Sequence, residues 1–181
     1  MILIKIIKWF DESEAEGYIN RFLEKFDSNS LDPVNDAILF YGAMSEAMLK
    51  SEKAEDEEKR EYAEIINDDI EEYESLVYAF EIRGHPETKA IFVLKKDEKK
   101  VGLWVGDYEP LPDVKNNIYM EMKPEVNLKI MNGDPNTDPD FFAGDLTVKG
   151  PLKLAVKPRD WISAFFDFIE REPKYLSEIK K

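Results

Sequence analysis

Apolar residues recur at helical spacing through the first 75 positions of the chain. Between Tyr18 and Phe26 they form one stripe, which predicts a helix that begins near Ser13. A second helix is expected from Asp32, a favourable capping residue that a proline follows. A third, over residues 53–72, has a narrow apolar stripe and many acidic residues elsewhere. The pattern therefore predicts a helical N-terminal part.

After position 75 apolar residues alternate with polar ones, which is the period of a strand. The alternation predicts strands over residues 76–83, 90–94, 101–105, 118–122 and 145–149. Short connections join the first three, so these are expected to pair antiparallel. We predict an α+β fold in which helices pack on a mainly antiparallel sheet of about five strands, preceded by an N-terminal helical extension.

Helices are also expected between and after the strands. Pro124–Met131 has a proline in its first turn and apolar residues at helical spacing, and a shorter turn is expected between Asp138 and Gly144. A closing helix over residues 161–169 is apolar around more than half of its circumference. This is more than a half-exposed helix requires, so we expect it to be buried on more than one side.

The length of 181 residues corresponds to one ordinary domain, with or without an appendage. We predict an N-terminal helical extension over residues 1–52 and a second part over residues 53–181 that holds the sheet. No glycine- or serine-rich linker separates the two parts, so one continuous domain is the alternative.

The charge of the chain restricts its partners. With 25 basic and 39 acidic residues the net charge is −14, and residues 51–75 alone hold 12 acidic and 3 basic residues. This charge repels phosphate backbones, so no nucleic-acid partner is expected. The apolar start, Met1–Phe10, is about half as long as a membrane span, so we expect no integral membrane association. Because the sequence has no cysteine, which suits a reducing compartment, we expect a cytoplasmic protein.

Residue patterns for catalysis are scarce. His85 is the only histidine and lies in a Gly-His-Pro turn, and the sequence has neither a phosphate-binding glycine loop nor a Gly-x-Ser-x-Gly elbow. Without cysteine there is no thiolate nucleophile. We therefore expect no catalytic residues, no cofactor and a protein that is not an enzyme.

One polar segment has the oxygen spacing of a calcium loop. Asp134, Asn136 and Asp138 occupy positions 1, 3 and 5 of such a loop, and Asp145 occupies position 12. Position 6, where the loop needs glycine, is Pro139, and the last ligand is an aspartate in place of the longer glutamate. The segment is better explained as an Asp- and Pro-rich turn, and no metal site is predicted.

Aromatic residues and methionines are concentrated in the last third of the chain. Methionine adapts to irregular shapes, and mixed aromatic and methionine linings suit varied apolar ligands. An ordinary core is the alternative explanation. The candidate ligand-binding residues are Met120, Met122, Ile130, Met131, Phe141, Phe142, Leu152, Val156, Trp161, Ile162, Phe165 and Phe166.

Residues 141–156 carry a resemblance to a known family. The run has an aromatic helix end and Gly144, then a strand, Gly150 and a further apolar segment. This order resembles the C-terminal signature of the sterol carrier protein type 2 fold family. The upstream strand and short helix, Met120–Met131, fit the same order, and the resemblance extends over about residues 55–170.

The resemblance implies a sheet with helices on one side that encloses a hydrophobic tunnel for fatty acyl chains, sterols or similar lipids, without covalent chemistry. We therefore expect a non-catalytic carrier whose partner is an apolar small molecule or lipid. The alternative is a structural or interaction module that uses the aromatic surface for dimerisation, as a homodimer, or for partner binding. A third hypothesis is an enzyme that uses carboxylates, or a metal at Asp134, Asn136 and Asp138.

Overall fold

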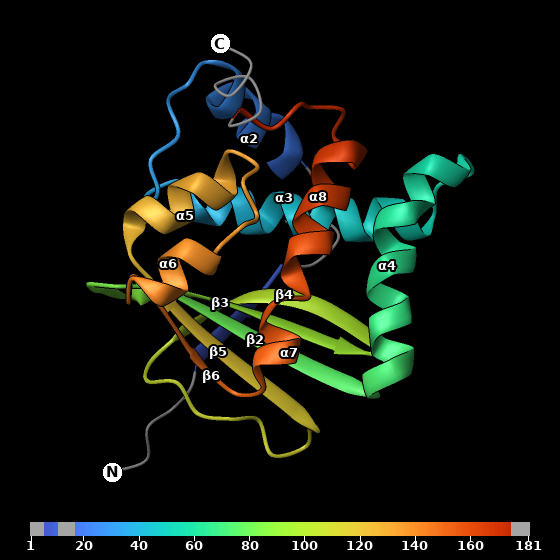
Figure 1. The fold of residues 1–181 in the computed structure, drawn as a ribbon. Coiled ribbons are helices and arrows are strands. Elements are labelled where there is room, and N and C mark those ends of the chain that lie inside the picture. Colours follow the sequence, from blue (N-terminus) through green and yellow to red (C-terminus); the bar gives the residue numbers. More distant parts are fainter. Residues whose placement is uncertain (1–5, 11–16, 175–181) are drawn as a thin grey trace.

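A six-stranded sheet lies at the base of the molecule in the computed structural model, which describes residues 6–10 and 17–174 (Figure 1). The strand order is β1-β4-β3-β2-β5-β6. All neighbouring pairs are antiparallel except β2 and β5, which are parallel. The strands are β1 (Ile6–Trp9), β2 (Ser75–Ile82), β3 (His85–Lys95), β4 (Glu98–Val105), β5 (Asn116–Met122) and β6 (Leu146–Lys149).

The α+β class and the five expected strands are confirmed, and the sheet has one strand more than expected. The additional strand is β1, which lies within the part of the chain expected to be helical. It pairs with the edge of β4, where Trp9 faces Gly102. A Cβ atom at Gly102 would lie 2.7 Å from the Trp9 ring, so glycine permits the close approach of the two strands.

Alternation along the strands gives the sheet two apolar faces. Tyr78, Phe92 and Met120 belong to the main core beneath the helices. On the opposite face, a second cluster around Val77 and Trp104 is covered by residues of the connection between β4 and β5. Both faces are therefore shielded, which explains the continuous apolar runs in the central strands.

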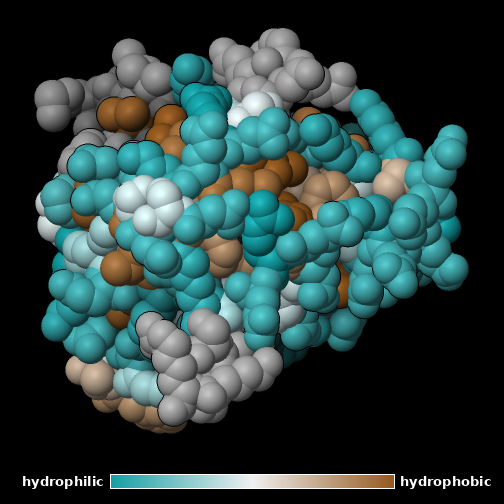
Figure 2. All heavy atoms as spheres, turned by 90° about the horizontal axis from the view of Figure 1, so that it is seen from above, coloured by the Kyte–Doolittle hydropathy of each residue, from teal (hydrophilic) through white to brown (hydrophobic). Residues whose placement is uncertain are grey.

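The helices gather on one side of the sheet (Figure 1). Helix α3 (Ala37–Glu52) crosses above it and is buried over most of its surface, with 11 of its 16 residues buried. Hydrophilic side chains cover most of the face seen from above, and hydrophobic atoms show between them near its middle (Figure 2). The helices are α2 (Tyr18–Asp27), α3 (Ala37–Glu52), α4 (Glu57–Tyr73), α5 (Pro124–Met131), α6 (Asp138–Phe142), α7 (Leu152–Ala155) and α8 (Pro158–Phe168).

Three helix starts differ from the expectation. Helix α4 begins at Glu57, four residues after its expected start. The oxygen Oδ1 of Asp32 accepts hydrogen bonds from the backbone N–H groups of Val34 and Asn35, so Asp32 caps a turn, and α3 begins only at Ala37. Helix α8 begins at Pro158, three residues before the expected start, because proline suits a first helical turn. The expected helix start near Ser13 lies outside the described residues.

Helix α2 is held against α3 by packing and by a buried acid. The Tyr18 ring lies so close to Gly42 that a Cβ atom there would be 2.5 Å from it. The carboxylate of Glu46, which is 4% exposed, accepts hydrogen bonds from the backbone N–H groups of Gly17 at 3.1 Å and Ile19 at 3.4 Å. The carboxylate therefore satisfies N–H groups at the start of α2 that have no partner within the helix.

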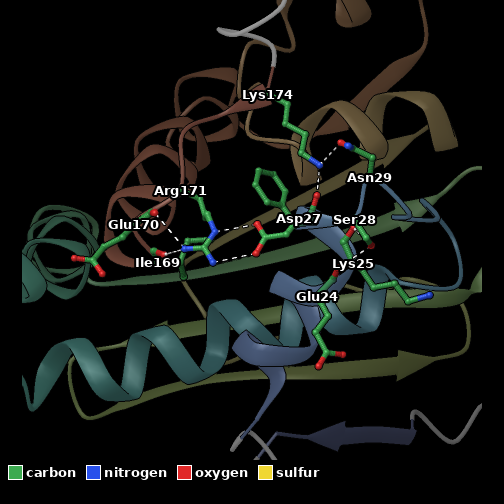
Figure 3. Close-up of polar contacts among 10 residues, drawn as sticks. Glu24, Lys25, Asp27, Ser28, Asn29, Ile169, Glu170, Arg171 and Lys174 are labelled. Carbon is green, nitrogen blue, oxygen red and sulfur yellow. Dashed lines mark hydrogen bonds and ion pairs between the residues drawn. The ribbon is translucent and has the colours of Figure 1, made fainter.

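After α8 the chain returns to the end of α2 (Figure 3). The guanidinium of Arg171 donates two hydrogen bonds of 3.0 Å to the carboxylate of Asp27. The ammonium of Lys174 donates to the backbone carbonyl of Phe26 and to the side chain of Asn29. We call residues 169–174 the C-terminal arm, and its contacts tie the end of the described chain to α2.

The contact between the C-terminal arm and α2 should weaken in acid. The hydrogen bond from Arg171 holds the pKa of the Asp27 carboxyl below its usual value. The folded state thus binds fewer protons than the unfolded state, so this stabilisation is complete above about pH 4 and is lost as the pH falls through the lowered pKa. Relative to the intrinsic rate at the same pH, we expect faster amide hydrogen exchange in the arm below pH 4. The Asp27→Asn variant should show the faster exchange already at neutral pH, and equal exchange in both proteins at neutral pH would contradict the assignment.

Candidate functional site

An apolar cavity of about 40 Å³ lies between the helix side of the sheet and helices α3, α5 and α8. Strand residues whose side chains alternate towards the helices form its floor. Residues of α3 and α8 form much of the rest of its wall. This inner cavity is lined by Phe40, Tyr41, Met44, Phe80, Phe92, Met120, Met122, Asn127, Ile130, Pro135, Thr137, Ala155, Pro158, Arg159, Trp161 and Ile162.

A second hollow of about 200 Å³ opens beside it, over β6 and between α6 and α7. It shares Met120, Thr137, Ala155 and Arg159 with the inner cavity. We call this hollow the outer groove and these four residues the junction. The remaining lining residues of the outer groove are Asp138, Phe141, Phe142, Leu146, Val148, Leu152 and Val156.

The outer groove has an exposed apolar rim. Phe142 is 84% exposed, Leu152 56%, Val156 43% and Phe141 36%, which makes them four of the five large exposed apolar residues among the described residues. The fifth, Val105, belongs to β4 at another part of the sheet. Large apolar side chains that gather at one exposed site are typical of surfaces that bind a ligand or a partner.

The structure divides the twelve candidate residues into three groups. Met120, Met122, Ile130, Trp161 and Ile162 line the inner cavity. The four rim residues line the outer groove. The other three are buried in the core and line neither hollow; they are Met131, Phe165 and Phe166.

Phe165 and Phe166 belong to an aromatic cluster behind the cavity. The Phe165 ring centroid lies 5.8 Å from that of Phe40, 6.0 Å from that of Phe22 and 6.2 Å from that of Tyr62. Phe166 packs in the same way against Phe22 at 6.5 Å. The cluster joins α8 to α2, α3 and α4, and so fixes α8 as a wall of the inner cavity.

Other lining residues were missed from sequence. Phe40, Tyr41 and Met44 come from α3, within the N-terminal stretch to which no binding role was assigned. Glu46 is the one charged residue within residues 37–49. This composition was an available signal, because a helix that is apolar over most of its circumference is expected to be buried. Thr137 and Arg159 were also missed, since a polar residue at a junction between two hollows has no signature in hydrophobic periodicity.

The walls of the inner cavity carry little charge. Burial raises the pKa of the Tyr41 phenol, which therefore stays neutral. The buried amide of Asn127 donates to the backbone carbonyl of Pro33 at 2.7 Å and is thus satisfied within the protein. The indole N–H of Trp161 donates to the carboxylate of Asp69 at 2.8 Å, which orients the ring against the cavity. Arg159 is the charged group that remains on the lining.

Two further hollows, of about 500 and 490 Å³, are larger but differ in chemistry. Most of their lining side chains are charged or amide groups, among them Glu125 and Lys129 in one and Glu58 and Arg171 in the other. Because ligand pockets are mostly apolar with a few convergent polar groups, the inner cavity and outer groove are the better site despite their smaller volumes.

The segment with calcium-loop spacing forms successive turns. The side chain of Asp134 accepts from the backbone N–H of Asn136, and that of Asn136 accepts from the N–H of Asp138. Asp138 pairs with Arg159, and Lys129 pairs with Asp134 and Asp140. Within residues 6–10 and 17–174, no three acidic, histidine or cysteine side chains come together as metal ligands.

None of the helices in the described part of the chain combines the length and the apolar composition that crossing a bilayer requires.

Comparison with known proteins agrees with this architecture. The structure of sterol carrier protein 2 from Yarrowia lipolytica, in its apo form, superposes with a TM-score of 0.50 at 19% identity, covering 74% of this chain and 94% of that one. The solution structure of sterol carrier protein domain 2 of Helicoverpa armigera has a TM-score of 0.42 at 20% identity, covering 71% and 87%. A search of curated protein sequences finds no match. The model of the SCP-2 sterol transfer family matches residues 53–161, and the chain therefore belongs to this family.

Proposed function

We propose that the protein is a non-catalytic carrier of an apolar small molecule, a fatty acyl, isoprenoid or sterol-like lipid, held in the inner cavity and the outer groove. The observation that carries the proposal is the junction, where a buried apolar cavity meets a groove with an exposed apolar rim. A ligand that passes from the surface to the core there would meet one pair of charged groups, Asp138 and Arg159, among apolar lining residues. The cysteine-free sequence supports a cytoplasmic location.

Binding would require the inner cavity to widen. Its volume of about 40 Å³ compares with roughly 300–1,000 Å³ for most ligand pockets. Met44, Met120 and Met122 line it, and unbranched methionine side chains change shape at low cost. We propose that these side chains move aside as the ligand enters, and that binding is driven by apolar area removed from water, at roughly 25 cal/mol per Å².

The two parts of the chain would then have different roles. Residues 53–181 would hold the ligand, in agreement with the family match over residues 53–161. Residues 1–52 would close the site, because α3 supplies Phe40, Tyr41 and Met44 to the wall of the inner cavity. The fit of α3 against the sheet would therefore set how much space a ligand finds.

Filling the junction should abolish ligand binding. Ala155 is 8% exposed and lines both hollows, so the Ala155→Trp variant would place an indole where the ligand has to pass. We expect at least a tenfold loss of affinity for a fluorescent fatty acid, measured by titration, and loss of any lipid that native mass spectrometry detects on the purified wild-type protein. Ala54→Trp is the matched control, because Ala54 lies between α3 and α4 and lines neither hollow.

Unchanged binding in a folded Ala155→Trp variant would remove the junction from the site. The carrier function itself would be contradicted by two results together. The wild-type protein would bind no fatty acid, isoprenoid or sterol, and native mass spectrometry would detect no lipid on the purified protein.

The exposed rim also favours a second candidate, an interface for a second copy of the chain. Phe142, Leu152 and Val156 would then be covered by the partner. Light scattering distinguishes the two functions, because a dimer that the Phe142→Ser variant dissociates supports the interface, whereas a monomer at high concentration contradicts it.

A further inference from the structure

Arg159 is the cation at the junction. It is the second residue of α8, directly after Pro158, and it lines both the inner cavity and the outer groove. In the part of the chain that the structure describes, no other positively charged side chain lines either hollow. Any ligand that extends from the outer groove into the core would therefore pass this guanidinium.

The guanidinium of Arg159 has a hydrogen-bond acceptor for one of its nitrogen atoms and, within residues 6–10 and 17–174, lacks one for another. Its Nη2 pairs with the carboxylate of Asp138 on α6, whose side chain is 57% exposed at the edge of the groove. Its Nε is buried and has no hydrogen-bond partner among the described residues. A buried N–H group without an acceptor is unfavourable, so an acceptor that reached Nε from the cavity would be held.

The position of Arg159 in its helix is also unfavourable. A cation in the first turn of a helix faces the positive end of the helix dipole, where an acidic side chain is preferred. An ion pair with Asp138 offsets this charge but leaves Nε without an acceptor. Stabilisation of α8 therefore does not explain why an arginine stands here, whereas an anion bound at the junction would satisfy both Nε and the local charge.

We propose that Arg159 determines which amphiphiles the site accepts, by binding a carboxylate head while the apolar chain occupies the inner cavity. This inference rests on the proposed carrier function. The planar guanidinium can donate two parallel hydrogen bonds to a carboxylate, and the ligand would take over the place of Asp138 on the groove side. A neutral head of the same size cannot compete with Asp138, so the site would discriminate between a long-chain acid and the alcohol of the same chain length.

The test compares palmitate with cetyl alcohol, each displacing the same fluorescent apolar probe from the full-length protein. A hydrogen bond to a charged group corresponds to about a ten- to hundredfold difference in affinity, and we expect the wild-type protein to prefer palmitate by at least the lower of these factors. Arg159→Met should remove that preference, because it should lower the affinity for palmitate at least tenfold more than the affinity for cetyl alcohol. Asp138→Asn should strengthen palmitate binding, because it removes the competing carboxylate.

Two further variants separate recognition from structure. Arg159→Lys keeps the charge but not the paired donors, so it should restore only part of the preference. Lys157→Met is the matched control, because Lys157 precedes α8, pairs with Asp69 at 3.3 Å and lines neither hollow. Its preference for palmitate should equal that of the wild type, and circular dichroism should show that each variant is folded.

The outcomes separate this inference from the carrier function. If the wild-type protein binds palmitate and cetyl alcohol equally well and Ala155→Trp binds neither, the role of Arg159 is overturned. The carrier function would still be supported by that result. An equal loss of both ligands in a folded Arg159→Met variant would also overturn it, since the arginine would then only support the wall. Binding of neither ligand by the wild-type protein would overturn both proposals.

Discussion

The Phe165→Ala variant is expected to lose about 3–5 kcal/mol of its free energy of unfolding, as large aromatic truncations in cores do. The side chain is 0% exposed and lies among rings from four helices. The surrounding rings are held by one another, so the space left behind cannot collapse completely. Urea unfolding followed by tryptophan fluorescence measures the loss.

Phe142→Ala makes the same substitution at a residue that is 84% exposed, and its cost should stay within about 0.5 kcal/mol. Similar losses in the two variants would contradict the placement of Phe165 in the core. Because Phe165 lines neither hollow, the folded fraction of Phe165→Ala should still bind a ligand. Phe165→Glu would instead bury an unpaired charge, so loss of uptake in that variant would report unfolding.

The Lys89→Met variant should be destabilised by about 3–5 kcal/mol, because it leaves one partner of a buried ion pair behind. The side chain of Lys89 is 1% exposed, and its ammonium lies 2.9 Å from the Glu81 carboxylate on the neighbouring strand. The ammonium also donates to the backbone carbonyls of Pro86 and Gly106. The other carboxylate oxygen of Glu81 accepts from the Tyr119 hydroxyl at 2.8 Å.

The double variant Lys89→Met with Glu81→Gln tests this reason. It removes both charges and keeps an acceptor for Tyr119, so we expect it to be more stable than Lys89→Met alone in urea unfolding. Lys95→Met is the control on the same strand, because Lys95 pairs with Asp113, whose side chain is 69% exposed, and such pairs contribute about 0–1 kcal/mol. A double variant less stable than Lys89→Met would show that the carboxylate is not the cause.

Strand positions followed from sequence because two-residue alternation records which side chain faces the core. In β5 the buried Ile118 and Met120 face the helices, and Tyr119 packs in the cluster on the other face. The parallel pairing of β5 with β2 could not be predicted from the sequence. The connection between β4 and β5 carries no sequence signal for the strand beside which β5 will lie. The strand β1 was missed for a related reason, since four residues are too few to show a period.

Only the apolar residues of the candidate site could be predicted from the sequence. Met120 and Trp161 stand out as large side chains on faces that must be buried, and both line the inner cavity. The same property selected Phe165, which lies in the core behind it, because apolar character does not distinguish a cavity wall from a packed interior. Arg159 depends on where α6 and α8 meet, and residues 21 positions apart reveal their pairing only once the chain is folded.

The place of β1 at the edge of the sheet has a consequence for synthesis of the chain. Ile6 pairs with Val105, so β1 cannot join β4 until almost a hundred further residues have been added. At roughly 5–20 residues per second this takes about 5–20 s. During that time β4, the strand with which Ile7 and Trp9 pair, has not yet been synthesised. The acidic helix α4 is made within this interval, before β4.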